Sequence, residues 1–266
     1  MVMNMRKIIF FDIDGTILDT SIRETSLLPQ LLNKLIELKK QGNTIVACTA
    51  RPKKFIDKYL PNIFDCMVLL NGSFVCTENQ VLMDNPLSKG EIYQLNSYFD
   101  SINASYIYIS NFSCWAYNIS PRRAKLLDDI YMVGSGYTTF SSAESNKVYA
   151  IDLFFDNEDQ YKRISPLIKA KTSLNLNYHK GDFTGDISFE GRDKSYAIDH
   201  VLQHYQIDIK NAYAFGDGTN DINVFKIIPN TCAVGNASPL LKQVASIVSK
   251  KTIALGVLEG LEHWGF

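Results

Sequence analysis

The sequence lacks the features that would place the chain in a membrane, outside the cell or on a nucleic acid. No apolar run approaches the ~20 residues that a membrane-spanning helix needs. Residues 1–7 lack the long apolar stretch of a secretory signal. The 27 basic and 28 acidic residues nearly cancel, so no strongly charged surface is indicated. We therefore expect a cytoplasmic protein with neither a membrane nor a nucleic acid among its partners.

Paired cysteine patterns are also missing. The chain has five cysteines, an odd number, and no two of them are spaced as Cys-x-x-Cys. Scattered cysteines in a chain without an export signal are typical of free, buried thiols in a reducing compartment. We expect this state for all of them, namely Cys48, Cys66, Cys76, Cys114 and Cys232.

The composition is that of an ordinary globular protein. Hydrophobic residues make up 46% and charged residues 21% of the 266 residues. This length is enough for one large domain or for a domain that carries a sizeable insertion. We find no internal repeat, no low-complexity tract and no charged tail.

The N-terminal part of the chain alternates short apolar runs with amphipathic segments. Residues 8–11, 44–48 and 67–70 have the pattern of strands that are buried on both faces. Leucines at helical spacing between the first two strands predict a helix that Ser26 caps and Gly42 ends. Strands that alternate with helices are typical of a Rossmann-like parallel sheet, so the expected fold class is α/β.

The pattern changes after this part, because tyrosine and phenylalanine become frequent. We expect a core domain of residues 1–83 and 188–266 with an inserted α+β cap domain of residues 84–187. Aromatic side chains of the insertion could stack on a sugar or another ring, but we expect most of them to form its own core. They include Tyr106, Tyr108, Trp115, Tyr117 and Phe155.

Residues with the chemistry of a site follow the expected strands. Asp12 and Asp14 come directly after the first strand, Thr49 comes after the second, and Lys194 opens a helix after the insertion. A glycine-rich turn after strand 212–215 adds Asp217, Asn220 and Asp221. The carboxyl ends of parallel strands meet at one edge of a sheet. Carboxylates favour Mg²⁺, and a lysine, a hydroxyl and helix N-termini suit phosphate, so we expect magnesium-assisted chemistry on a phosphate ester.

Four of these segments, in this order, resemble the motifs of the haloacid dehalogenase superfamily, and in particular its Cof-type phosphatases with a large inserted cap. The segments are Asp12-Ile13-Asp14-Gly15-Thr16, Thr49-Ala50-Arg51, Asp193-Lys194-Ser195 and Gly216-Asp217-Gly218-Thr219-Asn220-Asp221. Asn71-Gly72 and Gly235-Asn236-Ala237 fit the same branch. Ala50 and Ser195 stand where the family more often has glycine. The resemblance runs nearly end to end and implies the same fold.

The resemblance implies a nucleophile and a general acid and base. Asp12 would take the phosphoryl group as an aspartyl-phosphate, which splits one difficult displacement into two easier ones. Asp14 would first protonate the leaving oxygen and then deprotonate the attacking water. Arg51, from the second motif, is a candidate for an ion pair near the site.

The resemblance also implies the ligands of a metal and of a phosphoryl group. Asp12, the backbone carbonyl of Asp14, and Asp217 would bind Mg²⁺, and Asp221 would support that metal shell or orient Lys194. The residues expected to hold the phosphoryl oxygens are Thr49, Ala50, Lys194 and Asn220.

The expected function is therefore the hydrolysis of a small phosphorylated metabolite. The family favours a sugar phosphate, with pyridoxal phosphate and flavin mononucleotide as rivals. Two alternatives stay open: a phosphomutase of the same superfamily, and a non-catalytic sensor that binds a phosphorylated metabolite. The protein is expected to be a monomer or a small homo-oligomer.

Overall fold

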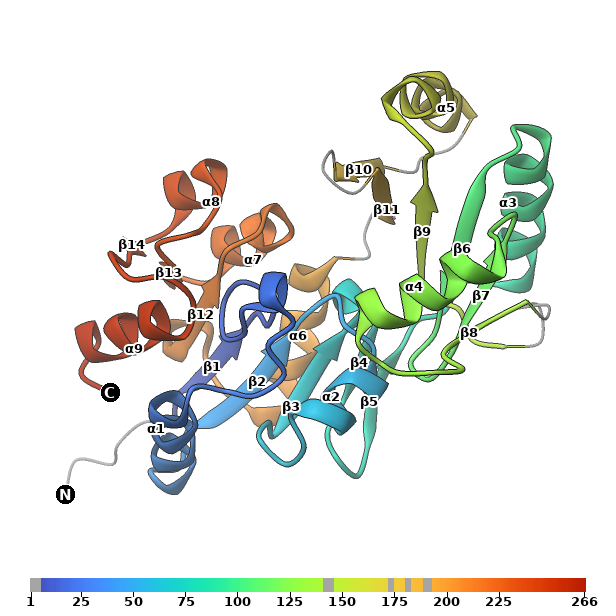
Figure 1. Ribbon diagram of the computed structural model, residues 1–266. Coiled ribbons are helices and arrows are strands. Elements are labelled where there is room, and N and C mark those ends of the chain that lie inside the picture. Colours follow the sequence, from blue (N-terminus) through green and yellow to red (C-terminus); the bar gives the residue numbers. More distant parts are fainter. Residues whose placement is uncertain (1–5, 141–145, 172–174, 180–182, 189–192) are drawn as a thin grey trace. The chain divides into compact units, whose positions relative to one another are not determined.

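The chain folds into two compact units. The computed structural model describes residues 6–140, 146–171, 175–179, 183–188 and 193–266 (Figure 1). Unit 1 comprises residues 1–51, 56–84 and 193–266, and unit 2 comprises residues 52–55 and 85–192. The grouping of residues 52–55 with the insertion was not expected. The assignment of the two units as a catalytic core and a cap domain stays a prediction.

An eight-stranded sheet forms the centre of unit 1. Neighbouring strands are parallel from β14 to β3, whereas β4 and β5 add an antiparallel hairpin at one edge. The parallel sheet confirms the expected α/β class, and the hairpin was not predicted. In spatial order the strands are β14 (Ile247–Val248), β13 (Asn230–Ala233), β12 (Ala212–Gly216), β1 (Ile8–Phe11), β2 (Thr44–Cys48), β3 (Cys66–Leu69), β4 (Phe74–Cys76) and β5 (Val81–Asp84).

The first strand of the chain lies in the middle of this sheet. All four residues of β1 are buried, and β2 and β12 flank it. Phe11 lies opposite Phe215 of β12, and the two rings stack with their centroids 5.1 Å apart. Apolar side chains on both faces of β1 thus explain why a short, continuously hydrophobic run becomes a central strand.

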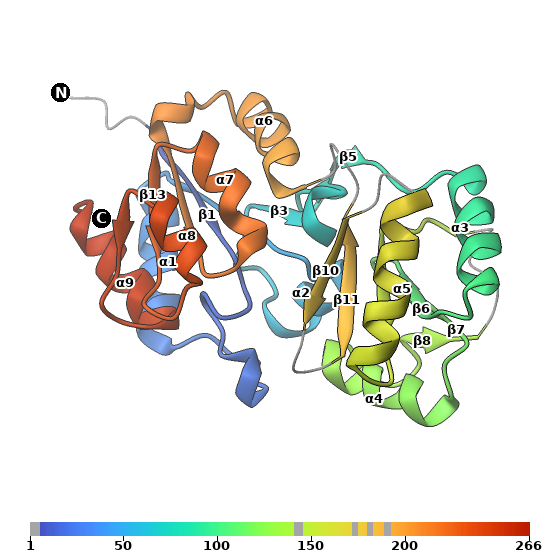
Figure 2. The ribbon, with the colours of Figure 1, turned by 90° about the horizontal axis from the view of Figure 1, so that it is seen from above.

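Helices cover both faces of the sheet. Gly260 of α9 packs against Phe215 and Cys232, so α9 covers the face of the sheet to which these two side chains belong. The helix α1 packs beside α9, and α6 and α7 lie on the other side (Figure 2). The helices of this part of the chain are α1 (Pro29–Lys40), α2 (Lys53–Tyr59), α6 (Lys194–Tyr205), α7 (Ile222–Ile227), α8 (Pro239–Val244) and α9 (Ile253–His263).

The expected start of the first helix was wrong. We expected Ser26 to cap α1, but its N-cap is Leu28, which makes no side-chain capping hydrogen bond. Pro29 occupies the first helical position instead. The proline ring holds φ at a helical value and needs no hydrogen-bond partner for its nitrogen, so the helix begins at this residue.

Unit 2 has its own sheet and its own core. Its six strands lie in the order β10 (Asn175–His179), β11 (Thr184–Ser188), β9 (Ala150–Phe154), β6 (Ser105–Ile109), β7 (Cys114–Tyr117) and β8 (Thr138–Thr139). Its helices are α3 (Lys89–Ser101), α4 (Pro121–Tyr131) and α5 (Glu158–Lys171). The sheet is antiparallel except for the pair of β7 and β8, and together with the helices it confirms the expected α+β character of the insertion.

The aromatic side chains of the insertion form that core. Tyr106, Tyr108, Trp115 and Phe155 are buried among residues of α3 and α5, and Tyr117 packs against them. The hydroxyl groups of Tyr106 and Tyr108 donate hydrogen bonds of 3.0 and 2.9 Å to the side-chain oxygen of Asn96 in α3. The expectation of a structural role for these rings is confirmed. None of the described helices is both long enough and apolar enough to span a bilayer.

Candidate active site

Two neighbouring strands of unit 1 end in aspartates. Asp12 follows β1 and Asp217 follows β12, and the N–H of Asp12 donates a 3.0 Å hydrogen bond to the carbonyl of Phe215. This bond continues the ladder between the two strands by one residue beyond β1. The parallel pairing therefore places both aspartates at the same edge of the sheet.

A buried lysine joins this edge to the helix that follows the insertion. The ammonium group of Lys194 donates hydrogen bonds of 2.7 Å to the carboxylates of both Asp12 and Asp221. The side chain of Lys194 is only 1% exposed, and those of the two aspartates are 7% and 4% exposed. Buried charges are tolerated only when they are paired in this way.

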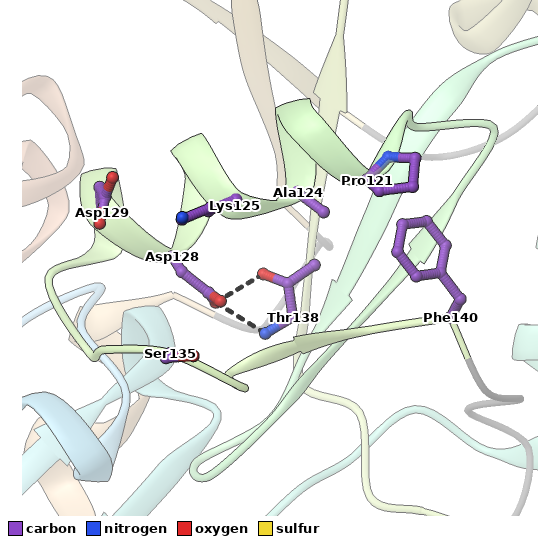
Figure 3. A pocket seen from close by; sticks show the side chains of 8 residues that line it. All are labelled: Pro121, Ala124, Lys125, Asp128, Asp129, Ser135, Thr138 and Phe140. Atoms are coloured by element: carbon purple, nitrogen blue, oxygen red, sulfur yellow. Dashed lines mark hydrogen bonds between the residues drawn. The ribbon is translucent and has the colours of Figure 1, made fainter.

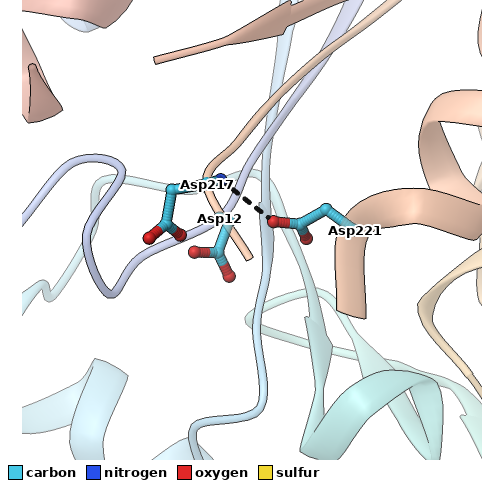
Figure 4. Close-up of side chains that lie close together, drawn as sticks. All are labelled: Asp12, Asp217 and Asp221. Atoms are coloured by element: carbon cyan, nitrogen blue, oxygen red, sulfur yellow. Dashed lines mark hydrogen bonds between the residues drawn. The ribbon is translucent and has the colours of Figure 1, made fainter. Parts of the chain in front are cut away.

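Asp221 is held by the backbone as well as by the lysine. One of its carboxylate oxygens accepts the N–H of Asp217 at 3.2 Å (Figure 4) and the N–H of Gly218 at the same distance. The other oxygen accepts the ammonium of Lys194. Both oxygens are therefore engaged in orienting the turn and the lysine. Of the two roles expected for Asp221, this arrangement favours the orientation of Lys194.

A threonine hydroxyl links the two strand-end aspartates. Thr16 is fully buried, and its hydroxyl lies 3.2 Å from Asp12 Oδ2 and 3.3 Å from Asp217 Oδ1. Gly15, just before it, has φ of +75°, and a Cβ at this position would collide with the Asp217 carboxylate. Only glycine therefore permits this close approach of the two loops. Gly15 and Thr16 were expected only to form the turn after the first strand, and their contacts with the two aspartates were not predicted.

The crowding of these carboxylates shifts their proton affinities. Burial raises the pKa of Asp12 well above its ordinary value, and the ammonium of Lys194 opposes this rise only in part. Burial, together with the charge of Asp221, raises the pKa of Asp217 from 3.8 to about 6. Burial alone would lower the pKa of Lys194, but the carboxylates of Asp12 and Asp221 outweigh it and raise that pKa.

Asp14 does not join this cluster in the structure. Its carboxylate forms an ion pair with Arg51, in which Arg51 Nε lies 3.0 and 2.9 Å from the two oxygens and Nη2 lies 2.5 Å from Oδ1. The ion pair expected for Arg51 is thus confirmed, and its partner is the candidate acid and base. Arg51 lies three residues beyond β2, the strand beside β1, so the sheet explains why the two side chains meet.

The remaining predicted residues make hydrogen bonds to partners other than the clustered carboxylates, or are exposed. The Thr49 hydroxyl accepts the N–H of Arg51 at 3.0 Å, and Ala50 is exposed. Asn220 donates a 3.3 Å hydrogen bond to the side chain of Asn71. Asn71 itself has φ of +53°, a backbone conformation that is rare outside glycine and common at functional sites.

The carboxylates fit a divalent cation. Oxygen atoms of Asp12, Asp217 and Asp221 lie within 4.8 Å of one another (Figure 4). Among the described residues, this is the one group of at least three Asp, Glu, His or Cys side chains that could hold a metal ion. Three carboxylates face one lysine, which leaves an excess of negative charge when all are ionised. A hard cation would neutralise that excess, and carboxylate oxygens are the ligands that Mg²⁺ prefers.

Unit 2 contains a separate pocket between α4 and β8. Its volume is about 350 Å³, and Figure 3 shows Asp128 pointing to Thr138 among the residues that line it. The Asp128 carboxylate accepts both the N–H and the hydroxyl of Thr138, at 2.7 and 2.9 Å. Asp128 therefore joins the helix to the strand. None of the predicted site residues lines this pocket.

Comparisons with known proteins show which family this chain resembles. A sequence profile described as haloacid dehalogenase-like hydrolase matches residues 9–261. YkrA of Bacillus subtilis (strain 168), which is named as a candidate phosphatase, is 27% identical over 97% of this chain and 98% of its own.

Solved structures share the fold. The subclass IIB sugar phosphatase BT4131 has a TM-score of 0.78 at 21% identity, over 97% of this chain and 99% of its own. The phosphatase BT1666 from Bacteroides thetaiotaomicron has a TM-score of 0.82 at 19% identity, over 99% of this chain and 97% of its own.

The raised pKa of Asp217 predicts how metal-free stability changes with pH. The folded state binds the proton of the Asp217 carboxyl group more tightly than the unfolded state does. The contribution of this proton to the free energy of unfolding is therefore complete below pH 3.8, and it is lost as the pH rises through about 6. Asp217→Asn should therefore be more stable than the wild type above pH 6 in chelator, by about 1 to 2 kcal/mol.

Urea unfolding between pH 4 and pH 8 measures this difference. Mg²⁺ should reverse the order at neutral pH, because it stabilises the protein that binds it. A variant no more stable than the wild type in chelator at pH 7.5 would contradict the prediction.

Proposed function

The chain belongs to the haloacid dehalogenase-like hydrolases, and from this premise we propose that it is a magnesium-dependent phosphatase of a small phosphorylated metabolite. The observation that carries the proposal is the convergence of three carboxylates with a buried lysine at one sheet edge. Mg²⁺ held there by Asp12 and Asp217 would offset the repulsion between an anionic nucleophile and an anionic phosphate.

In the first step of the proposed reaction, Asp12 is the nucleophile. A carboxylate oxygen of Asp12 forms a bond to phosphorus, the bond between phosphorus and the ester oxygen breaks, and the leaving oxygen takes a proton from Asp14. The hydrogen bond from Lys194 to Asp12 Oδ1 supports this role, because it holds the nucleophile in one orientation. Lys194, Thr49 and the backbone of Ala50 would bind the phosphoryl oxygens as charge develops on them.

In the second step, water attacks phosphorus and displaces Asp12. Asp14, now a carboxylate, takes a proton from the attacking water, the bond between Asp12 and phosphorus breaks, and inorganic phosphate leaves. Asp14 lies on the same unit as the nucleophile, and its ion pair with Arg51 holds the carboxylate that this step uses. We propose that this ion pair opens in the acid step, when Asp14 must carry the proton.

We further propose a sugar phosphate as substrate. A solved structure with the same fold is described as a sugar phosphatase, and the family resemblance favours this class. Pyridoxal phosphate and flavin mononucleotide are the rivals. We place the activity in the cytoplasm, because the five cysteines are free thiols and buried, as is usual in a reducing compartment.

Phosphate release tests the reaction class and its metal. In a panel of hexose phosphates, pyridoxal phosphate and flavin mononucleotide, we expect release with Mg²⁺ and a loss of at least about 100-fold with chelator, because the carboxylates then lack their counter-charge. Release from a sugar phosphate in preference to the cofactors would support the substrate class.

A phosphomutase would return the phosphoryl group to sugar instead of releasing it, and a sensor would bind without turnover. Folded protein that releases no phosphate from any member of the panel would therefore contradict the proposal.

The nucleophile is tested by Asp12→Asn. The amide cannot form the acyl phosphate, so turnover should fall by at least about 1,000-fold while circular dichroism stays unchanged. Asp208→Asn is a matched control, because Asp208 is exposed and caps a short helix at the start of β12. Turnover retained by Asp12→Asn would remove Asp12 as the nucleophile.

The acid and base are tested by Asp14→Asn. An amide cannot exchange protons with the leaving group or with water, so the rate should fall by about 100- to 10,000-fold. If hydrolysis of the intermediate is slowed more than its formation, intact-mass spectrometry should detect phosphorylated enzyme. An unchanged rate would show that Asp14 is not the acid and base.

A further inference from the structure

The loop that follows β13 contacts both aspartate-bearing loops of the site. The side-chain amide of Asn236 donates a 2.8 Å hydrogen bond to the carbonyl of Gly15. Two residues later, the N–H of Ser238 donates a 2.8 Å hydrogen bond to the carbonyl of Asp217. Residues 235–238, which we call the bracing loop, therefore hold the loop after β1 and the loop after β12 from one side.

The bracing loop is also bonded to the start of α9. The side-chain oxygen of Asn236 accepts the N–H of Ile253 at 2.9 Å, and the N–H of Gly235 donates to the carbonyl of Lys251 at 2.7 Å. Ile253 has φ of +51°, which is costly for a β-branched residue and persists only where surrounding contacts enforce it. The bond from Ile253 also orients the Asn236 amide, whose NH₂ group then faces Gly15.

The position of the Gly15 carbonyl affects the geometry of the site. It belongs to the peptide that leads into Thr16, whose hydroxyl contacts both Asp12 and Asp217. Gly15 also packs directly against the Asp217 carboxylate. A shift of this carbonyl would therefore change the spacing between the two aspartates that the proposed function assigns to Mg²⁺.

We propose that Asn236 is a positioning residue that sets the spacing of Asp12 and Asp217 and so the affinity for Mg²⁺, without touching the metal or the substrate. This inference rests on the proposed function. Partners beyond the metal ligands commonly change metal affinity by about 10- to 100-fold. Asn236 is exposed, so we expect a smaller effect, of at least about threefold, which is below that range.

Two substitutions separate geometry from charge. Asn236→Ser is neutral and reaches neither Gly15 nor Ile253. Asn236→Asp keeps an acceptor for Ile253 but opposes the Gly15 carbonyl. An added negative charge by itself strengthens cation binding, so weaker binding in both variants identifies the lost hydrogen bond to Gly15 as the cause.

Asn230 is a matched control at the opposite end of β13 from the bracing loop. Its side-chain amide also bridges backbone carbonyls, those of Lys210 and Ala212, at 3.0 and 2.9 Å. It lies at the first residue of β13, whereas the bracing loop follows the last. Asn230→Ser and Asn230→Asp should lower the melting temperature as the Asn236 variants do, yet leave Mg²⁺ affinity within twofold of the wild type.

Isothermal titration calorimetry of the full chain with Mg²⁺ alone, at pH 7.5 and without substrate, tests this role of Asn236. Weakening by threefold or more in both Asn236 variants, and not in the Asn230 variants, supports the inference. Affinity within twofold of the wild type in Asn236→Ser overturns it, even if phosphate release by the wild type upholds the proposed function. A wild type that binds no Mg²⁺ and releases no phosphate overturns both.

Discussion

The structure of unit 1 depends on the burial of two carboxylates around a single ammonium group. Asp12, Asp221 and Lys194 are almost wholly removed from water, and removing an ion from water costs several kcal/mol unless close partners replace the lost hydration. Each of the three side chains begins on a different element: the end of β1, the start of α6 and the turn before α7. Those elements must therefore be held at fixed distances, which constrains the sheet edge as a whole.

The convergence at this edge could be predicted because it follows from strand order. Asp12 and Asp217 each follow a buried apolar strand, and parallel strands end on the same side. The partner of each side chain could not be predicted, because it depends on local backbone angles. Gly15, with φ of +75°, brings Thr16 between the aspartates, while Asp14 pairs with Arg51. A residue pattern contains no information on such directions.

Contacts between residues far apart in the sequence also limited how much of the fold could be predicted. The frequent aromatic residues marked the insertion, and they form its core as expected. The hairpin of β4 and β5 was missed, since a short apolar run does not reveal whether its neighbour is parallel or antiparallel. Asn236 was visible only as part of a motif, because its partner Gly15 lies 221 positions away in the sequence.

The central position of β1 has a consequence for biosynthesis. A ribosome completes β1 first, but one of its two neighbours, β12, and the lysine that balances Asp12 are made only after the whole insertion. Until then Asp12 has no ammonium partner, and a nascent chain that buried it would leave an uncompensated charge. The sheet of unit 1 thus closes late, and unit 2, whose strands are contiguous between residues 105 and 188, is free to fold on the growing chain before it.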